Sequence, residues 1–142
     1  MAHLFALLHF LGVAILVGGE LLIALIAIRA QKDDTTLAFF LGFLYRIAAF
    51  MWVGLAIVVA GGVGLVLTLD YPWSGLFAAK LALLGFLIIV SVVMLFGLPK
   101  VKAAALQDPA GIRESGQFKR LDVLSRINLV LALAIMIISV LM

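Results

Sequence analysis

Four long apolar runs divide this chain, and each is long enough to cross a lipid bilayer as a helix. They cover residues 3–28, 37–69, 76–98 and 123–142, and about 20 apolar residues suffice to span the hydrocarbon core. A soluble domain of 142 residues cannot bury this much apolar surface, since 67% of the residues are hydrophobic and 12% are charged. The sequence therefore predicts an all-α integral membrane protein, one domain over residues 1–142 that forms an up-down four-helix bundle in contact with the lipid bilayer.

The polar segments between the runs predict where the helices end. We expect the third helix to stop at Pro99, because proline lacks the backbone N–H that continues a helix. A polar connection over residues 100–122 then leads to the fourth helix, which we expect to begin at Val123.

Basic residues are distributed unevenly between these connections, and their distribution predicts the orientation. The first connection carries Arg29 and Lys32, the second carries no Lys or Arg, and the third carries Lys100, Lys102, Arg113, Lys119 and Arg120. Cytoplasmic loops are enriched in Lys and Arg, so both termini are expected outside. The formal net charge of +3 thus reflects orientation, and no nucleic-acid-binding pattern is present.

Glu20 and Arg46 are ionisable residues within the apolar runs, where an unpaired charge costs several kcal/mol. Glu20 lies about 13 Å from the cytoplasmic end of the first run, and Arg46 about 15 Å from the same side. Opposite charges at matched depth on consecutive helices predict an intramembrane ion pair. Such a pair would fix the helix register or serve as a proton site; alternatively, Glu20 carries a proton and needs no partner.

His9 and Lys80 form a second layer of titratable residues, nearer the outer ends of their runs. His9 lies about 10 Å below the start of the first helix and Lys80 about 8 Å below the start of the third. His9 and Glu20 are eleven residues apart, three helical turns, and so share one face. His9 is either a metal ligand or a hydrogen-bonded core histidine. Lys80 is either its partner or extends to the lipid headgroups.

Glycines recur in the first two runs, at Gly18 and Gly19 and again at Gly61, Gly62 and Gly64. Small residues let membrane helices approach closely. The same positions would equally leave room for a flat cofactor, so the sequence alone keeps both interpretations open.

Three segments resemble a superfamily of small bacterial four-helix membrane proteins. They are Leu8-His-Phe-Leu-Gly-Val-Ala-Ile-Leu-Val-Gly-Gly19, Phe43-Leu-Tyr-Arg46 followed by Ala60-Gly-Gly-Val-Gly64, and Phe77-Ala-Ala-Lys80-Leu. The superfamily includes the HemJ-type protoporphyrinogen oxidases, the copper-resistance CopD membrane domain and families of unknown function. The segment from Phe118 to Asn128, a basic stretch followed by Asn, is similar to the last of these groups.

This resemblance implies a multi-pass protein of the bacterial inner membrane that binds haem b or a related porphyrin in its bundle, with a redox or electron-transfer function. His9 and Lys80 match the family's haem-linked positions, so they are the expected cofactor-binding residues, with His9 on the haem iron. His3 and His9 are the only histidines and lie on different helix faces, so we expect the second axial position to be filled by Lys80, water or a second protomer. A protoporphyrinogen oxidase activity stays open.

Two other functions fit the same sequence. The chain would serve as a non-catalytic accessory or assembly subunit of a larger membrane complex of the respiratory type. Less favoured is a small-molecule or metal-ion permease, because four helices form a narrow pore and would need to oligomerise. The expected partners are therefore a second copy of the chain or other membrane subunits.

Overall fold

The computed structural model describes residues 1–69, 74–108 and 111–141. In this part of the chain it contains the helices α1 (Ala2–Ala30), α2 (Asp34–Leu69), α3 (Gly75–Gln107) and α4 (Gly116–Leu141), with a short 3-10 helix, η1 (Ile112–Glu114), before α4. All four α-helices are long and apolar enough to cross a membrane. The predicted all-α bundle of four helices is confirmed, and its composition is that of a multi-pass membrane protein in contact with lipid.

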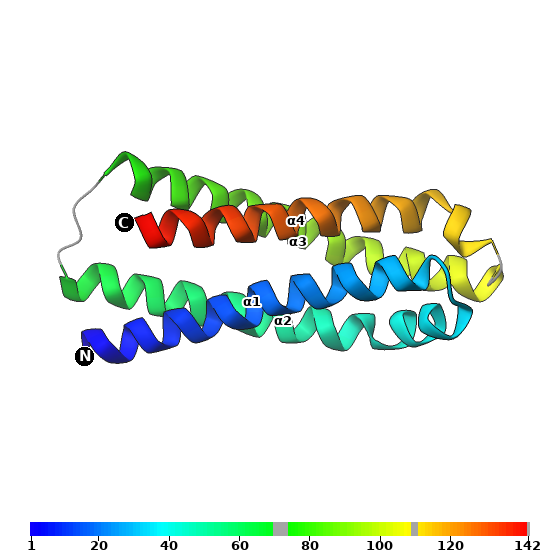
Figure 1. The fold of residues 1–142 in the computed structure, drawn as a ribbon, viewed down its shortest axis with the longest axis horizontal. Coiled ribbons are helices and arrows are strands. Elements are labelled where there is room, and N and C mark those ends of the chain that lie inside the picture. The colour runs from blue at the N-terminus through cyan, green and yellow to red at the C-terminus, as the bar shows by residue number, and fades with distance from the viewer. Residues whose placement is uncertain (70–73, 109–110, 142) are drawn as a thin grey trace.

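The helices run alternately up and down and form two hairpins, α1–α2 and α3–α4 (Figure 1). Both chain termini lie at one end of the bundle, which we call the terminal end. The α1–α2 turn, η1 and the start of α4 lie at the other end, the basic end. Helix α1 packs along α2 and also contacts α4, whereas α2 and α3 contact each other little.

Helix α3 continues through Pro99 to Gln107, so the prediction that it ends at this proline is wrong. Proline removes one backbone hydrogen bond and is costly inside a helix. Burial of the surrounding side chains opposes this cost, because Leu98 is 3% exposed and Val101 is 1% exposed. The extra turns pack against the start of α4 and η1 and enlarge the core at the basic end.

Helix α4 begins at Gly116, seven residues before the predicted Val123. The Ser115 hydroxyl accepts a hydrogen bond from the Phe118 backbone N–H at 3.2 Å and so caps the helix. Phe118 and Leu121 are buried in the core. Hydropathy missed these turns because their outward-facing residues, such as Lys119 and Arg120, are charged and exposed.

Helix α2 also starts earlier than predicted, at Asp34, because Asp33 caps it. The Asp33 carboxylate accepts hydrogen bonds from the hydroxyl and the backbone N–H of Thr36, the latter at 2.8 Å. These two bonds, the hydroxyl bond first, hold the pKa of Asp33 below its usual range. The cap therefore remains ionised at neutral pH.

Glycines on both helices bring α1 and α2 into backbone contact. A Cβ atom at Gly12 would lie 2.6 Å from the Val58 backbone N, and one at Gly61 would lie 2.6 Å from the His9 backbone N. Gly54 and Gly61 are seven residues apart, as are Gly12 and Gly19, a spacing of two helical turns. We call these four positions the glycine seam. Of the glycines that the sequence analysis identified, Gly19, Gly61 and Gly64 serve helix packing, whereas nothing lies within 4 Å of a Cβ atom at Gly18.

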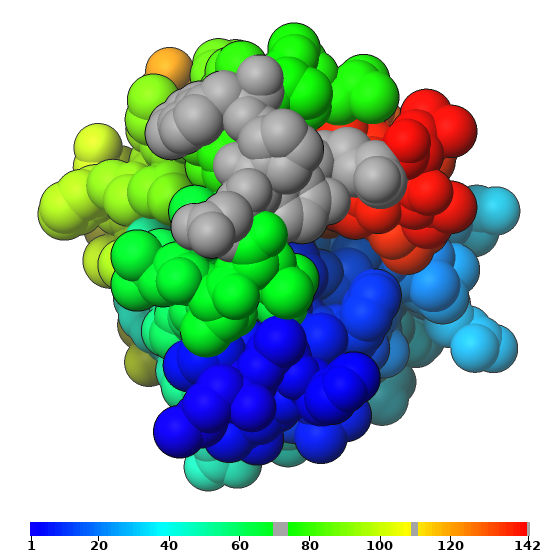
Figure 2. All heavy atoms as spheres, turned by 90° about the vertical axis from the view of Figure 1, so that its left-hand side faces the viewer, coloured from blue at the N-terminus to red at the C-terminus, as the bar shows by residue number. Residues whose placement is uncertain are grey.

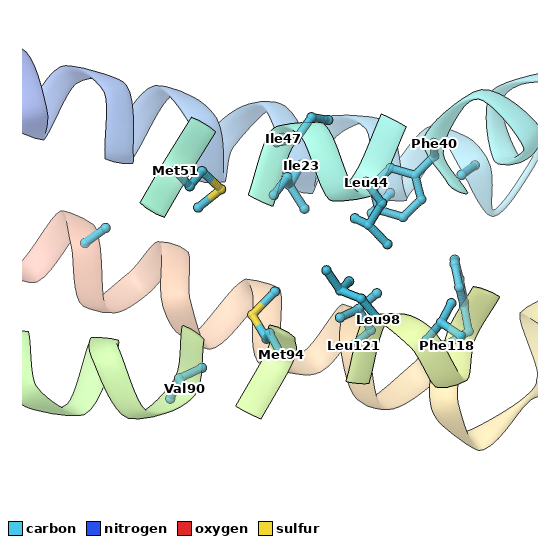
Figure 3. Close-up of a cluster of buried hydrophobic side chains, with 14 of the residues drawn as sticks. Ile23, Phe40, Leu44, Ile47, Met51, Val90, Met94, Leu98, Phe118 and Leu121 are labelled. Carbon is cyan, nitrogen blue, oxygen red and sulfur yellow. The ribbon is translucent and has the colours of Figure 1, made fainter. Parts of the chain in front are cut away.

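The buried apolar core joins the two hairpins in the half nearest the basic end. Figure 3 shows Phe40, Leu44 and Met51 of α2 opposite Met94 and Leu98 of α3. Arg113 adds a polar contact between the hairpins: its Nε donates to the Ala30 backbone carbonyl at 3.0 Å, and its Nη2 lies 2.6 Å from the Asp34 carboxylate. The basic end is therefore closed by packing and by this arginine.

The two hairpins diverge towards the terminal end (Figure 1). No residue of α3 from Gly75 to Phe86 is buried, and the buried positions of this helix start at Leu87. In the view onto this end, α1 and α2 occupy the lower part and α3 and α4 the upper part (Figure 2). The continuous core therefore extends from the basic end only as far as Leu87 on α3 and Ile135 on α4.

We expect Gly61→Ala to destabilise the protein by about 1–3 kcal/mol, because the new methyl group would press against the His9 backbone. Gly18→Ala is the matched control, since nothing lies within 4 Å of a Cβ at Gly18. It should be neutral or slightly stabilising, as alanine favours a helix over glycine. Unfolding by sodium dodecyl sulfate in mixed micelles measures both; equal stabilities of the two variants would contradict the glycine seam.

Candidate functional site

Glu20 is fully buried in the middle of the bundle, with an exposed fraction of 0%. It lies on the face of α1 that also carries Leu16 and Ile23, which are part of the core. This face points away from the lipid because the glycine seam fixes the rotation of α1 against α2. The chain thus places a carboxyl group in the least polar part of the molecule.

Polar side chains from two other helices meet this carboxyl group. The amide nitrogen of Asn128, on α4, donates to Glu20 Oε1 at 2.5 Å and is 2.9 Å from the hydroxyl oxygen of Ser91, on α3. Asn128 is 1% exposed. Glu20, Ser91 and Asn128, which we call the central polar cluster, therefore link three of the four helices.

A cavity of about 40 Å³ lies beside the cluster. Its walls are mostly apolar, with Met51 and Trp52 from α2 and Met94 from α3, and its polar lining comes from the central polar cluster. A water molecule needs a cavity of roughly 10–15 Å³ and two or more polar partners. Both conditions are met here.

Two atoms of the cluster lack a hydrogen-bond partner within the described part of the chain, although both are fully buried. They are Glu20 Oε2 and Asn128 Oδ1. Buried polar atoms in native proteins are nearly always hydrogen-bonded, to protein or to ordered water. The cluster is thus chemically incomplete and has room for a small polar species.

The structure corrects the predicted ion pair between Glu20 and Arg46, because it does not bring the two side chains together. Arg46 is exposed, and its guanidinium lies 5.3 Å from the centroid of the Phe43 ring. It lines a groove on the outer side of the α1–α2 hairpin. Helix α2 has 36 residues, about 54 Å at the usual rise, so it exceeds the roughly 30 Å hydrocarbon core and Arg46 can extend towards the headgroups.

His9 is nearly buried, with an exposed fraction of 9%, and lies in the terminal half of the bundle. Its Nδ1 donates to the Val58 backbone carbonyl at 2.9 Å. The ring also contacts the Gly62 position, where a Cβ atom would lie 3.4 Å from Nδ1. This bond orients the imidazole, and in the neutral ring it leaves Nε2 as the nitrogen without a proton; within the described residues Nε2 makes no hydrogen bond.

Lys80 is half-buried on the loosely packed half of α3. The structure shows no hydrogen bond between Lys80 and His9, whose Nδ1 donates to Val58. Lys80 makes no ion pair with any described residue. The sequence therefore identified two titratable groups that share one region without forming a preassembled pair.

Asn128 is the principal residue that the analysis of charges missed. Its segment was noted in the sequence only for its family resemblance, because an amide side chain carries no charge. Asp122, Ser125 and Asn128 recur every three residues, which is a polar stripe along one face of α4. That spacing is the sequence signal by which Asn128 and the buried Ser125 could have been found.

A metal centre held by several protein ligands is absent from the described residues, where no three His, Cys, Asp or Glu side chains come together. At Gly61 and Gly64 there is no space for a flat cofactor, since the Phe5 ring covers Gly64 and the His9 backbone covers Gly61, whereas Gly18 lies open on the groove that Arg46 lines.

Comparisons of the chain with models of protein families, with curated proteins and with solved structures find no match.

We expect Asn128→Leu to destabilise the protein by about 1–3 kcal/mol, because it removes the hydrogen-bond partner of a fully buried carboxyl group. The double variant Glu20→Met/Asn128→Leu should recover part of this loss, with a coupling free energy of about 0.5–2 kcal/mol. Unfolding of the two single variants and the double variant in mixed micelles gives the coupling. Strictly additive effects would show that the pair does not interact.

Proposed function

We propose that this chain is an integral membrane protein that binds haem b, or a related porphyrin, between the diverging halves of its two hairpins and acts in electron transfer. The observation that carries the proposal is the His9–Val58 hydrogen bond, which leaves Nε2 free. Histidines that bind metals typically donate their other ring N–H to a carbonyl or carboxylate. His9 has this arrangement, although no group of three metal-binding side chains surrounds it among the described residues.

The neighbourhood of His9 supports the same function. The half of α3 that would have to move aside for a porphyrin, Gly75 to Phe86, has no buried residue, so little packing is lost when the hairpins separate further. Lys80, on the same stretch of α3, is half-buried and makes no ion pair with any described residue. It would pair with a propionate or serve as a second ligand.

His9, Val58 and Lys80 would each have a different role in binding the haem. His9 would hold the iron, and the Val58 carbonyl would keep the ring in one tautomer and orientation. Lys80 would neutralise an acidic edge of the ligand. The haem, when bound, supplies a one-electron redox centre.

We further propose that the terminal end faces the outside of a bacterial inner membrane and the basic end faces the cytoplasm. The basic end carries the Lys and Arg residues of two connections, among them Arg29, Lys32, Arg113 and Lys119. Excess Lys and Arg mark the cytoplasmic side of membrane proteins. His9 would then be reached from the outer leaflet.

Visible absorption spectroscopy of the purified protein, expressed with added haem precursor, tests the haem proposal. We expect a Soret band in the wild type that is lost or strongly reduced in His9→Ala, because the iron loses its protein ligand. His3→Ala is the matched control and should leave the band unchanged, since His3 lies on another face of α1. A wild type without a Soret band, or one insensitive to His9→Ala, rejects the proposal.

An accessory subunit of a larger membrane complex is the second candidate. It is favoured by the unburied residues of α3 between Gly75 and Phe86, a face that another membrane subunit or a second copy would cover. Purification from the native membrane in a mild detergent, followed by native mass measurement, distinguishes the candidates. A partner protein in constant ratio supports the accessory function, and a self-sufficient monomer or dimer contradicts it.

A further inference from the structure

The central polar cluster contains a carboxyl group whose charge nothing nearby can compensate. Glu20 is the sole ionisable side chain among the described residues that line the 40 Å³ cavity. The charged and titratable groups nearest to it along the four helices lie elsewhere: His9 is three turns away on α1, Arg46 is exposed on α2, and Lys80 is near the terminal end of α3. Asp122 and Arg126 pair with each other at 2.8 Å on α4, and the remaining charged groups lie nearer the ends of the helices.

An ionised carboxylate in this position would have a single protein donor, the Asn128 amide. Transfer of a lone carboxylate into an apolar interior is so unfavourable that such groups take up a proton instead. The carboxyl group of Glu20 therefore belongs to the class of buried acids that hold a proton under ordinary conditions.

The two unpartnered atoms of the cluster point to where that proton lies. Glu20 Oε2 and Asn128 Oδ1 would both be acceptors without a donor if Glu20 were ionised. One proton on Oε2 changes this, because the acid O–H can then donate to Asn128 Oδ1, directly or through a water molecule in the cavity. A single proton thus satisfies both atoms.

Two further polar side chains lie on α4 between this site and the basic end, Ser125 and Asp122. Ser125 lies one turn from Asn128 on α4, and its hydroxyl is buried without a partner among the described residues. Ser125 and Asp122 are the polar residues that line a smaller, otherwise apolar cavity of about 10 Å³, and the Asp122 side chain is 17% exposed. Towards the terminal end, the buried residues that follow are apolar: Leu16, Leu87 and Leu131.

We propose that Glu20 is a proton-binding site that exchanges its proton with the basic side of the membrane through Ser125 and Asp122, while the Asn128 amide holds the Glu20 carboxyl group in place. The proton leaves Glu20 Oε2, passes to water and the hydroxyl of Ser125, and reaches the Asp122 carboxylate, from which it enters the solvent. The reverse sequence recharges the site. This proposal is independent of haem, because it uses neither His9 nor Lys80.

The composition of the chain allows a direct test without altering the site. Glu20 and Glu114 are the only two glutamates. In the variant Glu114→Gln, glutamate labelled with ¹³C at its side-chain carboxyl carbon therefore reports on Glu20 alone. Glu114 is an exposed residue that pairs with Lys119 at 2.7 Å, and its replacement leaves the bundle interior intact. Infrared spectra of the labelled protein in lipid vesicles then show whether Glu20 is protonated.

We expect an isotope-shifted carboxylic-acid C=O band at neutral pH that moves further when H₂O is replaced by D₂O. Asp122→Asn and Ser125→Ala in the same labelled background should slow this exchange by about tenfold, the effect of losing one hydrogen-bonding partner. Ser139→Ala is the matched control: this α4 hydroxyl donates to the Ile135 carbonyl at 2.7 Å, beyond the proposed route, and its loss should leave the rate unchanged.

Two outcomes would overturn the proposal. A carboxylate band in place of the acid band at neutral pH would mean that Glu20 is ionised, and dependence of that band on added Na⁺ would identify a cation site formed by the same oxygen atoms. An acid band whose exchange is equally fast in Asp122→Asn, Ser125→Ala and Ser139→Ala would show that the proton does not use α4.

Discussion

The close approach of α1 and α2 along the glycine seam is the contact on which the positions of all candidate functional groups depend. Lipid gives apolar helices no hydrophobic reason to associate, so van der Waals contact and interhelical hydrogen bonds must hold them together. Gly12 and Gly61 provide that contact, backbone against backbone. Because the seam fixes the rotation of α1, His9 lies against the Val58 carbonyl and Glu20 faces the second hairpin.

Hydropathy was sufficient to predict the number and type of helices but not their ends. A run of apolar residues shows where the chain is in contact with hydrocarbon, whereas a helix ends where its backbone hydrogen bonds stop. Beyond Pro99, α3 is amphipathic and continues because Val101 is buried. Before Val123, α4 has charged residues on its exposed side while Phe118 packs in the core. Both extensions depend on tertiary contacts, which a hydropathy profile does not contain.

The sequence identified Glu20 as a buried functional candidate but assigned it the wrong partner. Two side chains on neighbouring helices can pair only if they lie at the same depth in the membrane and also point towards each other. Glu20 and Arg46 agree in depth, but the buried face of α2 passes through Ile47 and Met51, and Arg46 lies beside that face. Asn128 meets both requirements, and the three-residue spacing of Asp122, Ser125 and Asn128 on α4 is the sequence feature that contains this information.

The two titratable regions lie on opposite sides of an apolar layer. Leu16, Leu87 and Leu131 are buried between the level of His9 and the level of Glu20, so water shared between the two regions would have to cross three packed leucines. Both groups nevertheless belong to one face of one helix, eleven residues apart. A redox centre at His9 and a proton at Glu20 would therefore influence each other through the electric field in a medium of low dielectric constant, or through movement of α1 itself. Proton transfer at Glu20 and electron transfer at His9 would then take place towards opposite sides of the membrane, although both residues belong to α1.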